Sequence, residues 1–221
     1  MEQKKYVQKK SSLSQKAYLE LRNDIYRNKI KPGDCLSENL IASELNMSRT
    51  PVREALRILE NEDLVEIKDG IGIYVKTILL SDIEDIFEVR KVLEALAFKT
   101  SMNRITDEEI TNLEEKFKKL MLDFNNGIDV PMDSFVSVDW ELDELIVNKC
   151  KNNYIISIMN DIKAKIIRYQ YMSYEALNDV VESTSQHLRI LSLIRERNLK
   201  ELIDANGKHI DWSLSCFVRN K

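Results

Sequence analysis

Apolar residues recur every three or four positions along most of this chain, which is the spacing of an amphipathic helix. Ala17, Leu21 and Ile25 repeat at intervals of four and predict a helix over residues 13–29. The run Lys31-Pro32-Gly33-Asp34 ends that helix. The chain is therefore expected to be mainly helical, with strand patterns confined to one short segment.

Two short amphipathic helices are predicted between residues 36 and 64. Ser37 is expected to cap the first, because its hydroxyl can accept from the unpaired amides of the first turn. Ser48 is expected to cap the second, with Pro51 in its first turn, where the missing amide proton costs little. The apolar residues expected to face inward are Leu40, Ile41 and Leu45, then Val52, Ala55, Leu56 and Leu59.

The outer face of the second helix is rich in cations and hydroxyls. Two helices that meet at a sharp angle form a helix-turn-helix, and the start of its second helix meets base edges in the major groove. Arginine can bond guanine through two parallel hydrogen bonds and can also hold phosphates. An ordinary helical hairpin with a solvated arginine face would show the same spacing. If the DNA-binding interpretation is followed, the residues of this face expected to contact DNA are Ser48, Arg49, Thr50, Arg53 and Arg57.

Residues 65–75 predict a two-stranded wing beside these helices. Apolar residues alternate with polar ones on both sides of Asp69-Gly70, a dipeptide typical of a hairpin turn. A hairpin directly after a helix-turn-helix makes a winged helix. Lys68 and Gly70 complete the predicted DNA-binding set.

Short motifs in this N-terminal part carry a family resemblance. They are Pro32-Gly33, Leu36-Ser37-Glu38, the run from Ser48 to Leu56, and Gly70 with Gly72. On these residues the chain resembles the GntR family of bacterial transcription regulators over about residues 12–76. The resemblance implies that Arg49, Thr50 and Arg53 contact DNA and that Gly70 lets the wing tip approach the minor groove. Asp69 departs from the pattern, because a neutral or basic residue would suit DNA better.

Net charge changes this picture only in detail. The formal net charge of the 221 residues is −4, which by itself does not favour a DNA binder. Residues 1–78 carry 14 Lys and Arg against 12 Asp and Glu, whereas the rest carries 19 against 25. DNA binding would therefore depend on local placement of cations and on dimerisation. Lys4, Lys5, Lys9 and Lys10 form either a loose phosphate-binding arm or a solvated tail.

Composition argues against several other classes of protein. No run of 18 or more apolar residues occurs, so neither a transmembrane helix nor a membrane partner is expected. The Lys-rich start lacks the apolar stretch of a signal peptide. Cys35, Cys150 and Cys216 are scattered and odd in number, which indicates free thiols in a reducing cytoplasm. The expected location is cytoplasmic.

From residue 82 onward only helical patterns occur. Residues 82–102 carry an apolar face wider than a surface helix needs, made of Ile83, Ile86, Phe87, Val89, Val92, Leu93, Leu96 and Ala97. Further helices are expected at residues 106–125, 132–149, 152–173, 178–197 and 199–218, the first of them opened by a capping box of Thr106 and Glu109. The expected fold is mainly α, with a winged helix-turn-helix in residues 1–78 and an antiparallel helical bundle in residues 79–221.

A few charged and imidazole side chains stand out in the bundle, namely Arg90 and Glu94, Asp139 and Asp143, and His187 and His209. On these positions the bundle resembles the FCD-type ligand-sensing domain of the FadR group. The two histidines are 22 residues apart, and Asn198 midway between them lies in a predicted turn. On an antiparallel helical hairpin they would therefore lie at the same level and could face each other.

These side chains can form a mononuclear metal site. Asp139 and Asp143 are one helical turn apart, so two carboxylates from one helix could meet two imidazoles from the hairpin. The resemblance implies one Asp and three His, and here Asp143 stands where a His is expected. Two carboxylates and two imidazoles are harder ligands, so the site is expected to prefer Mn²⁺ or Fe²⁺ over Zn²⁺, with Ni²⁺ still possible. In the alternative, Asp143 does not ligate, and three protein ligands remain together with water or a ligand carboxylate. Alternatively, the carboxylates are solvated and both histidines are hydrogen-bonded core residues.

Arg90 and Arg168 are candidates for binding an effector. A buried guanidinium near a metal can grip a carboxylate through two hydrogen bonds. Arg90 could instead form an i,i+4 pair with Glu94. Arg168 is a candidate only because it lies on a helix that is expected to line the same cavity.

The sequence thus predicts a dimeric transcription regulator that binds a palindromic operator and senses a small carboxylate, a divalent metal or both. Two alternatives use the same fold, namely a metal-dependent enzyme and a dimerisation bundle without ligand. No Ser-His-Asp arrangement, Glu-x-x-His motif or phosphate loop supports the enzyme, so the protein is not expected to be one.

Overall fold

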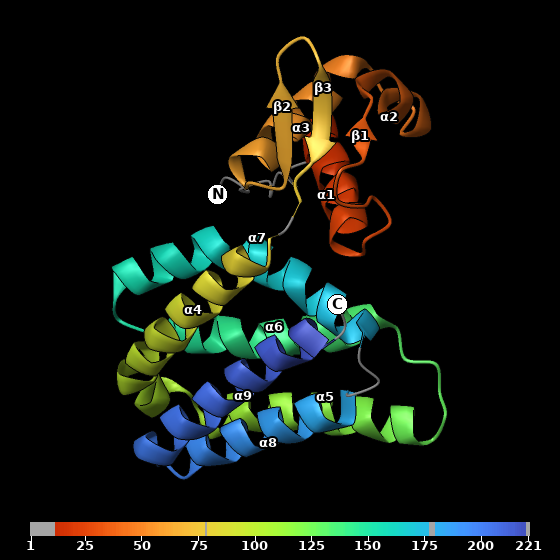
Figure 1. Cartoon of the computed structure of the whole chain (residues 1–221). Coiled ribbons are helices and arrows are strands. Elements are labelled where there is room, and N and C mark those ends of the chain that lie inside the picture. The colour runs from red at the N-terminus through yellow and green to blue at the C-terminus, as the bar shows by residue number, and fades with distance from the viewer. Residues whose placement is uncertain (1–11, 78, 177–179, 220–221) are drawn as a thin grey trace, which may run out of the picture. The chain divides into compact units, whose positions relative to one another are not determined.

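A computed structural model describes residues 12–77, 79–176 and 180–219 of the chain (Figure 1). The chain divides into two compact units, Met1–Thr77 and Ile78–Lys221. In its described residues, the first unit combines three helices with a small sheet, and the described part of the second consists of helices and their connections.

The first unit is a winged helix-turn-helix. Its helices are α1 (Leu13–Tyr26), α2 (Glu38–Glu44) and α3 (Arg49–Asn61). The turn between α2 and α3 is tight because Asn46 adopts a left-handed φ of 50°. The amide of Met47 then donates to the carbonyl of Ala42. This confirms the two amphipathic helices predicted from the sequence.

The wing contains one strand more than predicted. The strands β2 (Val65–Lys68) and β3 (Gly72–Val75) form the expected antiparallel hairpin around Gly70, whose φ is 72°. A further strand, β1 (Cys35–Leu36), pairs with the other edge of β3. A strand of two residues is too short to show a period of two, so only the pairing reveals it.

Two details of the first unit differ from the prediction. Leu40 was expected to face inward but is 66% exposed, because α2 is short and buries only Ile41 and Ala42. Ser48 does occupy the N-cap position of α3, but its side chain makes no capping hydrogen bond. Its hydroxyl is therefore not committed to holding the helix start.

The second unit is the predicted antiparallel helical bundle. Its helices are α4 (Leu80–Ser101), α5 (Asp107–Asn125), α6 (Met132–Lys149), α7 (Asn153–Ala176), α8 (Val180–Arg195) and α9 (Leu199–Arg219), with a 3-10 turn, η1, at Met102–Arg104. The starts of α5 and α6 are as expected. Thr106 and Glu109 form the capping box, and α6 follows Pro131. The large side chains Phe98, Phe117 and Met159 are fully buried in one apolar core.

None of the helices in the described part of the chain has the length and apolar character needed to cross a membrane.

Candidate functional site

The exposed face of α3 presents the predicted DNA-binding residues. Val52, Ala55, Leu56 and Leu59 are fully buried against the rest of the first unit. Because these apolar positions recur at helical spacing, the residues between them must point outward. The side chains on that outer face are Ser48, Arg49, Thr50, Arg53 and Arg57, all of them exposed.

One carboxylate holds two of these arginines. Glu38 is the first residue of α2, and its Oε1 and Oε2 accept hydrogen bonds of 2.8 Å from Nε and Nη2 of Arg53. Nη2 of Arg49 donates to the same Oε2 at 3.0 Å. These contacts lower the pKa of Glu38 to about 2, with the hydrogen bond from Arg53 as the largest cause. Glu38 raises the pKa of Arg53 in return.

The Glu38 contacts decide which N–H groups of these arginines remain available to a ligand. With Nε and Nη2 of Arg53 occupied, its remaining N–H groups are directed away from Glu38. Sequence reasoning included Glu38 in a family motif but gave it no role. Its partners lie 11 and 15 residues further along the chain, so no local periodicity connects them.

The wing carries the other predicted DNA-binding residues. Lys68 lies at the end of β2, where its Nζ is 3.2 Å from the carboxylate of Glu66 and 5.6 Å from the ring centre of Tyr74. Gly70 lies at the tip with open space around its Cα, and the neighbouring Ile71 is exposed. The wing tip can therefore approach a groove without a steric obstacle.

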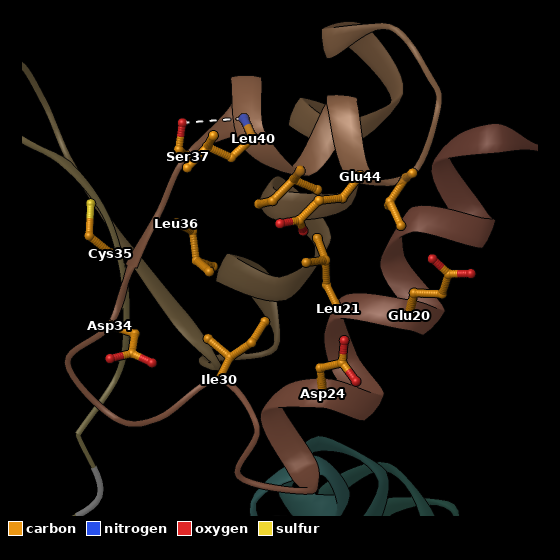
Figure 2. A pocket seen from close by; sticks show the side chains of 12 residues that line it. Glu20, Leu21, Asp24, Ile30, Asp34, Cys35, Leu36, Ser37, Leu40 and Glu44 are labelled. Carbon is orange, nitrogen blue, oxygen red and sulfur yellow. Dashed lines mark hydrogen bonds between the residues drawn. The ribbon is translucent and has the colours of Figure 1, made fainter.

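A groove on the first unit has the opposite charge. It measures about 380 Å³ and lies between α1, β1 and α2, as Figure 2 shows. Its walls carry the carboxylates of Glu20, Asp24, Asp34 and Glu44. Such a surface repels phosphates, so this groove is unsuited to DNA. The lysines at positions 4, 5, 9 and 10 lie outside the described residues.

A second group of candidate residues is buried in the helical bundle. It comprises one arginine on α4, two aspartates on α6 and one histidine on each of α8 and α9. All of them are between 4% and 7% exposed: Arg90, Asp139, Asp143, His187 and His209. Four helices thus direct polar side chains to one region of the core.

The two histidines face each other, as their equal spacing from the turn between the last two helices predicted. The centres of the His187 and His209 rings are 4.3 Å apart, on either side of the turn that contains Asn198. Oδ1 of Asp139 lies 3.1 Å from Nδ1 of His187. Nδ1 of His209 donates to Oε1 of Gln186 at 2.8 Å, which leaves its Nε2 as the ring atom with a free lone pair.

Arg90 is held by carboxylates from two helices. Its Nε donates to Glu94 one turn along α4, which is the i,i+4 pair left open by the sequence. Its Nη2 donates to Oδ2 of Asp143 at 2.9 Å. Asn206 donates to the second oxygen of Glu94 at 2.8 Å and completes a buried network. Asp143 therefore contacts Arg90, whereas Asp139 is the aspartate beside the histidines.

Burial dominates the protonation of this cluster. It lowers the pKa of His187 to about 3, assisted by the positive charge of Arg90, and it lowers the pKa of His209 well below the usual value. It raises the pKa of Asp143 to about 7, and Arg90 opposes this shift only in part. For Arg90 itself, the carboxylates of Asp143 and Glu94 outweigh the effect of burial and raise the pKa.

These properties fit a cation in two respects. Neutral imidazoles are the form that binds metals. Asp139 places a carboxylate oxygen 3.1 Å from Nδ1 of His187, and carboxylates are the second kind of donor that divalent metals take. In residues 12–77, 79–176 and 180–219, however, no group of three His, Cys, Asp or Glu side chains is arranged to hold a metal ion. Asp139, His187 and His209 converge without forming a finished ligand set.

The remaining candidate lies on α7. Arg168 is buried, as is its neighbour Tyr169 in the apolar core. The hydroxyl of Tyr171 donates to Asp133 at 2.8 Å. These aromatic side chains therefore have structural roles. The effector role of Arg168 stays a prediction.

Comparison with known proteins identifies both units. The family model for bacterial regulatory proteins of the gntR family matches residues 13–75, and the FCD domain model matches residues 85–211. The gluconate operon transcriptional repressor of Bacillus licheniformis is 30% identical over 211 residues, which cover 89% of this chain and 84% of the relative. The HTH-type transcriptional repressor RspR of Escherichia coli K12 is 26% identical over 198 residues, or 90% and 86% of the two chains.

A solved structure shares the fold. E. coli McbR/YncC superposes with a TM-score of 0.78 and 18% sequence identity, covering 94% of this chain and 98% of that one.

Proposed function

We propose that this chain, a DNA-binding transcriptional regulator that belongs to the GntR family of bacterial regulatory proteins and carries an FCD domain, binds a palindromic operator as a homodimer. We further propose that it responds in the cytoplasm to a small carboxylate and a divalent metal in its helical unit. Its domains and its named relatives are those of regulators rather than enzymes. The observation that carries the proposal is the outward face of α3, where Arg49, Thr50 and Arg53 stand together beside the wing.

DNA recognition would use α3 in the major groove. Arg49 and Arg53 would supply paired hydrogen bonds to guanine or contacts to phosphates, and Ser48 and Thr50 would supply hydroxyl donors. One unit offers only a few cations, so a second copy on the neighbouring half-site would double both the contacts and the sequence that is read. Relatives named as repressors support repression as the direction of control.

Sensing would use the buried cluster of the bundle. Asp139, His187 and His209 would hold the metal, which would supply a positive charge to bind a carboxylate. Arg90 would bind the same carboxylate, and Asp143 would orient Arg90 rather than ligate. Relatives named for a gluconate operon support a carboxylate as the effector. Mn²⁺, Fe²⁺, Ni²⁺ and Zn²⁺ are the candidate ions.

Operator binding by an Arg49→Ala variant tests the DNA-binding assignment. The variant should lose roughly 1–3 kcal/mol of specific affinity, because one base contact is removed. Lys29→Ala is the matched control, since Lys29 pairs with Asp24 beside the acidic groove. Fluorescence anisotropy on operator DNA measures both. If Arg49→Ala bound as tightly as the unaltered chain, Arg49 would have no role in recognition.

Metal content tests the sensing assignment independently of DNA. Protein purified without a histidine tag should carry about one transition metal per chain by mass spectrometry. A His187→Ala/His209→Ala variant should carry none. If the unaltered protein were empty and resisted reloading, Arg90 and an organic ligand bound without metal would become the sensing hypothesis.

A further inference from the structure

Helix α4 exposes an apolar stripe on the side that faces away from the bundle core. Ile83, Phe87 and Phe98 are buried on its inner side, and this is enough to anchor the helix. On the outer side, Val89, Val92 and Leu96 are 43%, 61% and 41% exposed. Exposed apolar residues that line up on one helix mark an interaction surface rather than a solvated face.

The stripe has the spacing of a helix-pairing seam. Its members and the two charged residues that flank it are Asp85, Val89, Val92, Leu96 and Lys99. The intervals are four, three, four and three, which keep all five residues on one side of the helix and match the seam of a coiled coil. From Asp85 to Lys99 the seam is about 21 Å long at a rise of ~1.5 Å per residue.

The charges at the two ends of the seam are opposite. Asp85 and Glu88 are exposed near the start of α4, and Lys99 is exposed near its end. Across the described residues, neither Asp85 nor Lys99 has an ion-pair partner within the chain. Lys91, which points to another side of α4, is already paired with Asp211. The acidic and basic ends of the seam are thus both available to an external partner.

We propose that the seam on α4 binds the same seam of a second copy of this chain, antiparallel and across a two-fold axis near Val92. This rests on the dimer of the proposed function and specifies its surface. A two-fold axis requires a self-complementary patch. The seam meets this requirement, because Val92 is its midpoint and an antiparallel copy brings Asp85 and Glu88 of each chain to the partner's Lys99.

A parallel copy does not fit the same seam. It would place Asp85 against Asp85 and Lys99 against Lys99, and like charges at close range oppose association. The antiparallel arrangement also brings the positive end of each helix dipole near the negative end of the other.

The seam would form the centre of the interface rather than all of it. A stable interface buries about 800 Å² per partner, which is more than one helix stripe supplies. Helix α7 packs against α4, with the rings of Phe87 and Tyr169 6.4 Å apart, and it exposes Tyr154 and Ile158. These two side chains offer apolar area on the helix adjoining α4.

Substitution at the midpoint of the seam tests the location of the surface. Val92→Glu would place two carboxylates near the axis and should raise the dimer dissociation constant by at least about 100-fold. Leu122→Glu is the matched control, because Leu122 is a similarly exposed apolar residue on α5. Sedimentation velocity over a concentration series measures the dissociation constants, and circular dichroism confirms that each variant is folded.

A charge swap tests the orientation. Lys99→Glu and Asp85→Lys should each weaken the dimer alone, because each creates two like-charge contacts. Mixing the two variants should restore association, and the double variant Asp85→Lys/Lys99→Glu should dimerise by itself. Failure of both rescues would rule out the antiparallel pairing.

The outcomes separate this inference from the proposed function. A dimer that survives Val92→Glu as well as it survives Leu122→Glu would overturn the α4 surface and leave dimeric operator binding intact. A wild-type chain that stays monomeric, both free and on operator DNA, would overturn the proposed dimer together with its surface.

Discussion

Glu38 shows how a single side chain can set the chemistry of a recognition helix. Its carboxylate accepts hydrogen bonds from both Arg49 and Arg53, so the two guanidiniums are oriented before DNA arrives. A cation held in one geometry discriminates between bases better than a mobile one, although part of its charge is neutralised. Glu38 is therefore expected to favour specificity at the expense of non-specific attraction.

The variant Glu38→Gln should reduce discrimination between operator and random DNA. Affinity for random DNA should rise, because the surface loses one negative charge and phosphate attraction increases as the net charge becomes more positive. Affinity for the operator should rise less or fall, because Arg53 loses its charged anchor. Anisotropy titrations on both DNAs at two salt concentrations give the ratio of operator affinity to random-DNA affinity. A ratio equal to that of the unaltered chain would show that Glu38 has no positioning role.

The low pKa of Glu38 also has a consequence for stability. Its folded-state value of about 2 lies below the ordinary value of 4.5. The ionised carboxylate therefore stabilises the folded protein above about pH 4.5, and this contribution is lost as the pH falls toward 2. Between these pH values, Glu38→Gln should lose less stability than the unaltered chain. Thermal midpoints measured across this range would contradict the idea if the two curves stayed parallel.

Arg90 is expected to be structurally essential whether or not it binds an effector. Replacing it with alanine would leave Glu94 and Asp143 buried without their cation. Removing one partner of a buried ion pair costs about 3–5 kcal/mol. Lys91→Ala is the matched control, since the Lys91–Asp211 pair is exposed and such pairs contribute about 1 kcal/mol or less. Urea unfolding measures both, and equal losses would show that the buried network is not stabilising.

At the scale of single elements, two helix starts offer a direct comparison. Thr106 and Glu109 satisfy each other's backbone amides at the start of α5, whereas Ser48 makes no capping bond at the start of α3. Thr106→Ala should therefore cost about 1 kcal/mol of unfolding free energy, and Ser48→Ala should cost much less. Urea unfolding of the two variants measures the difference. A similar loss in both would mean that the Ser48 hydroxyl does stabilise the helix.

Most of the elements could be predicted because they carry a local signal in the sequence. The spacing of apolar residues predicts the helices of the bundle, and the capping box predicts the start of α5 within one residue. β1 was not predicted, because a strand of two residues is too short to show a period of two. Leu40 was wrongly predicted to be buried, because the seven-residue helix α2 buries too narrow a face. The excess apolar width of α4 was visible, but only the structure shows that Val89, Val92 and Leu96 are its exposed part.

The candidate site was predicted only where spacing along the chain fixes position in space. His187 and His209 meet because the turn between α8 and α9 lies midway between them. The pairing of Arg90 with Asp143 joins residues 53 positions apart on helices that are not consecutive. No sequence spacing specifies that contact, so the sequence could not show which aspartate lies beside the histidines. Tertiary packing of α4 on α6 decides it.

The whole molecule acts as a switch only if the bundle ligand binds one DNA-binding state more tightly than the other. The coupling must be reciprocal, so ligand and operator change each other's affinity by the same factor. With Mn²⁺ and gluconate as the probe, we expect operator affinity to change by about 5- to 150-fold. Calorimetry with and without operator should show that the affinity of the protein for the probe changes by the same factor.

The His187→Ala/His209→Ala variant separates coupling from DNA binding in this experiment. It lacks the imidazoles of the bundle but retains Arg49 and Arg53 on α3, so it should bind operator and ignore the probe. If the unaltered chain bound operator equally with and without saturating Mn²⁺ and gluconate, that probe would not be its signal. If the double variant still responded, the signal would enter elsewhere in the bundle, because removing both imidazoles leaves Asp139 without the ligands that a metal needs.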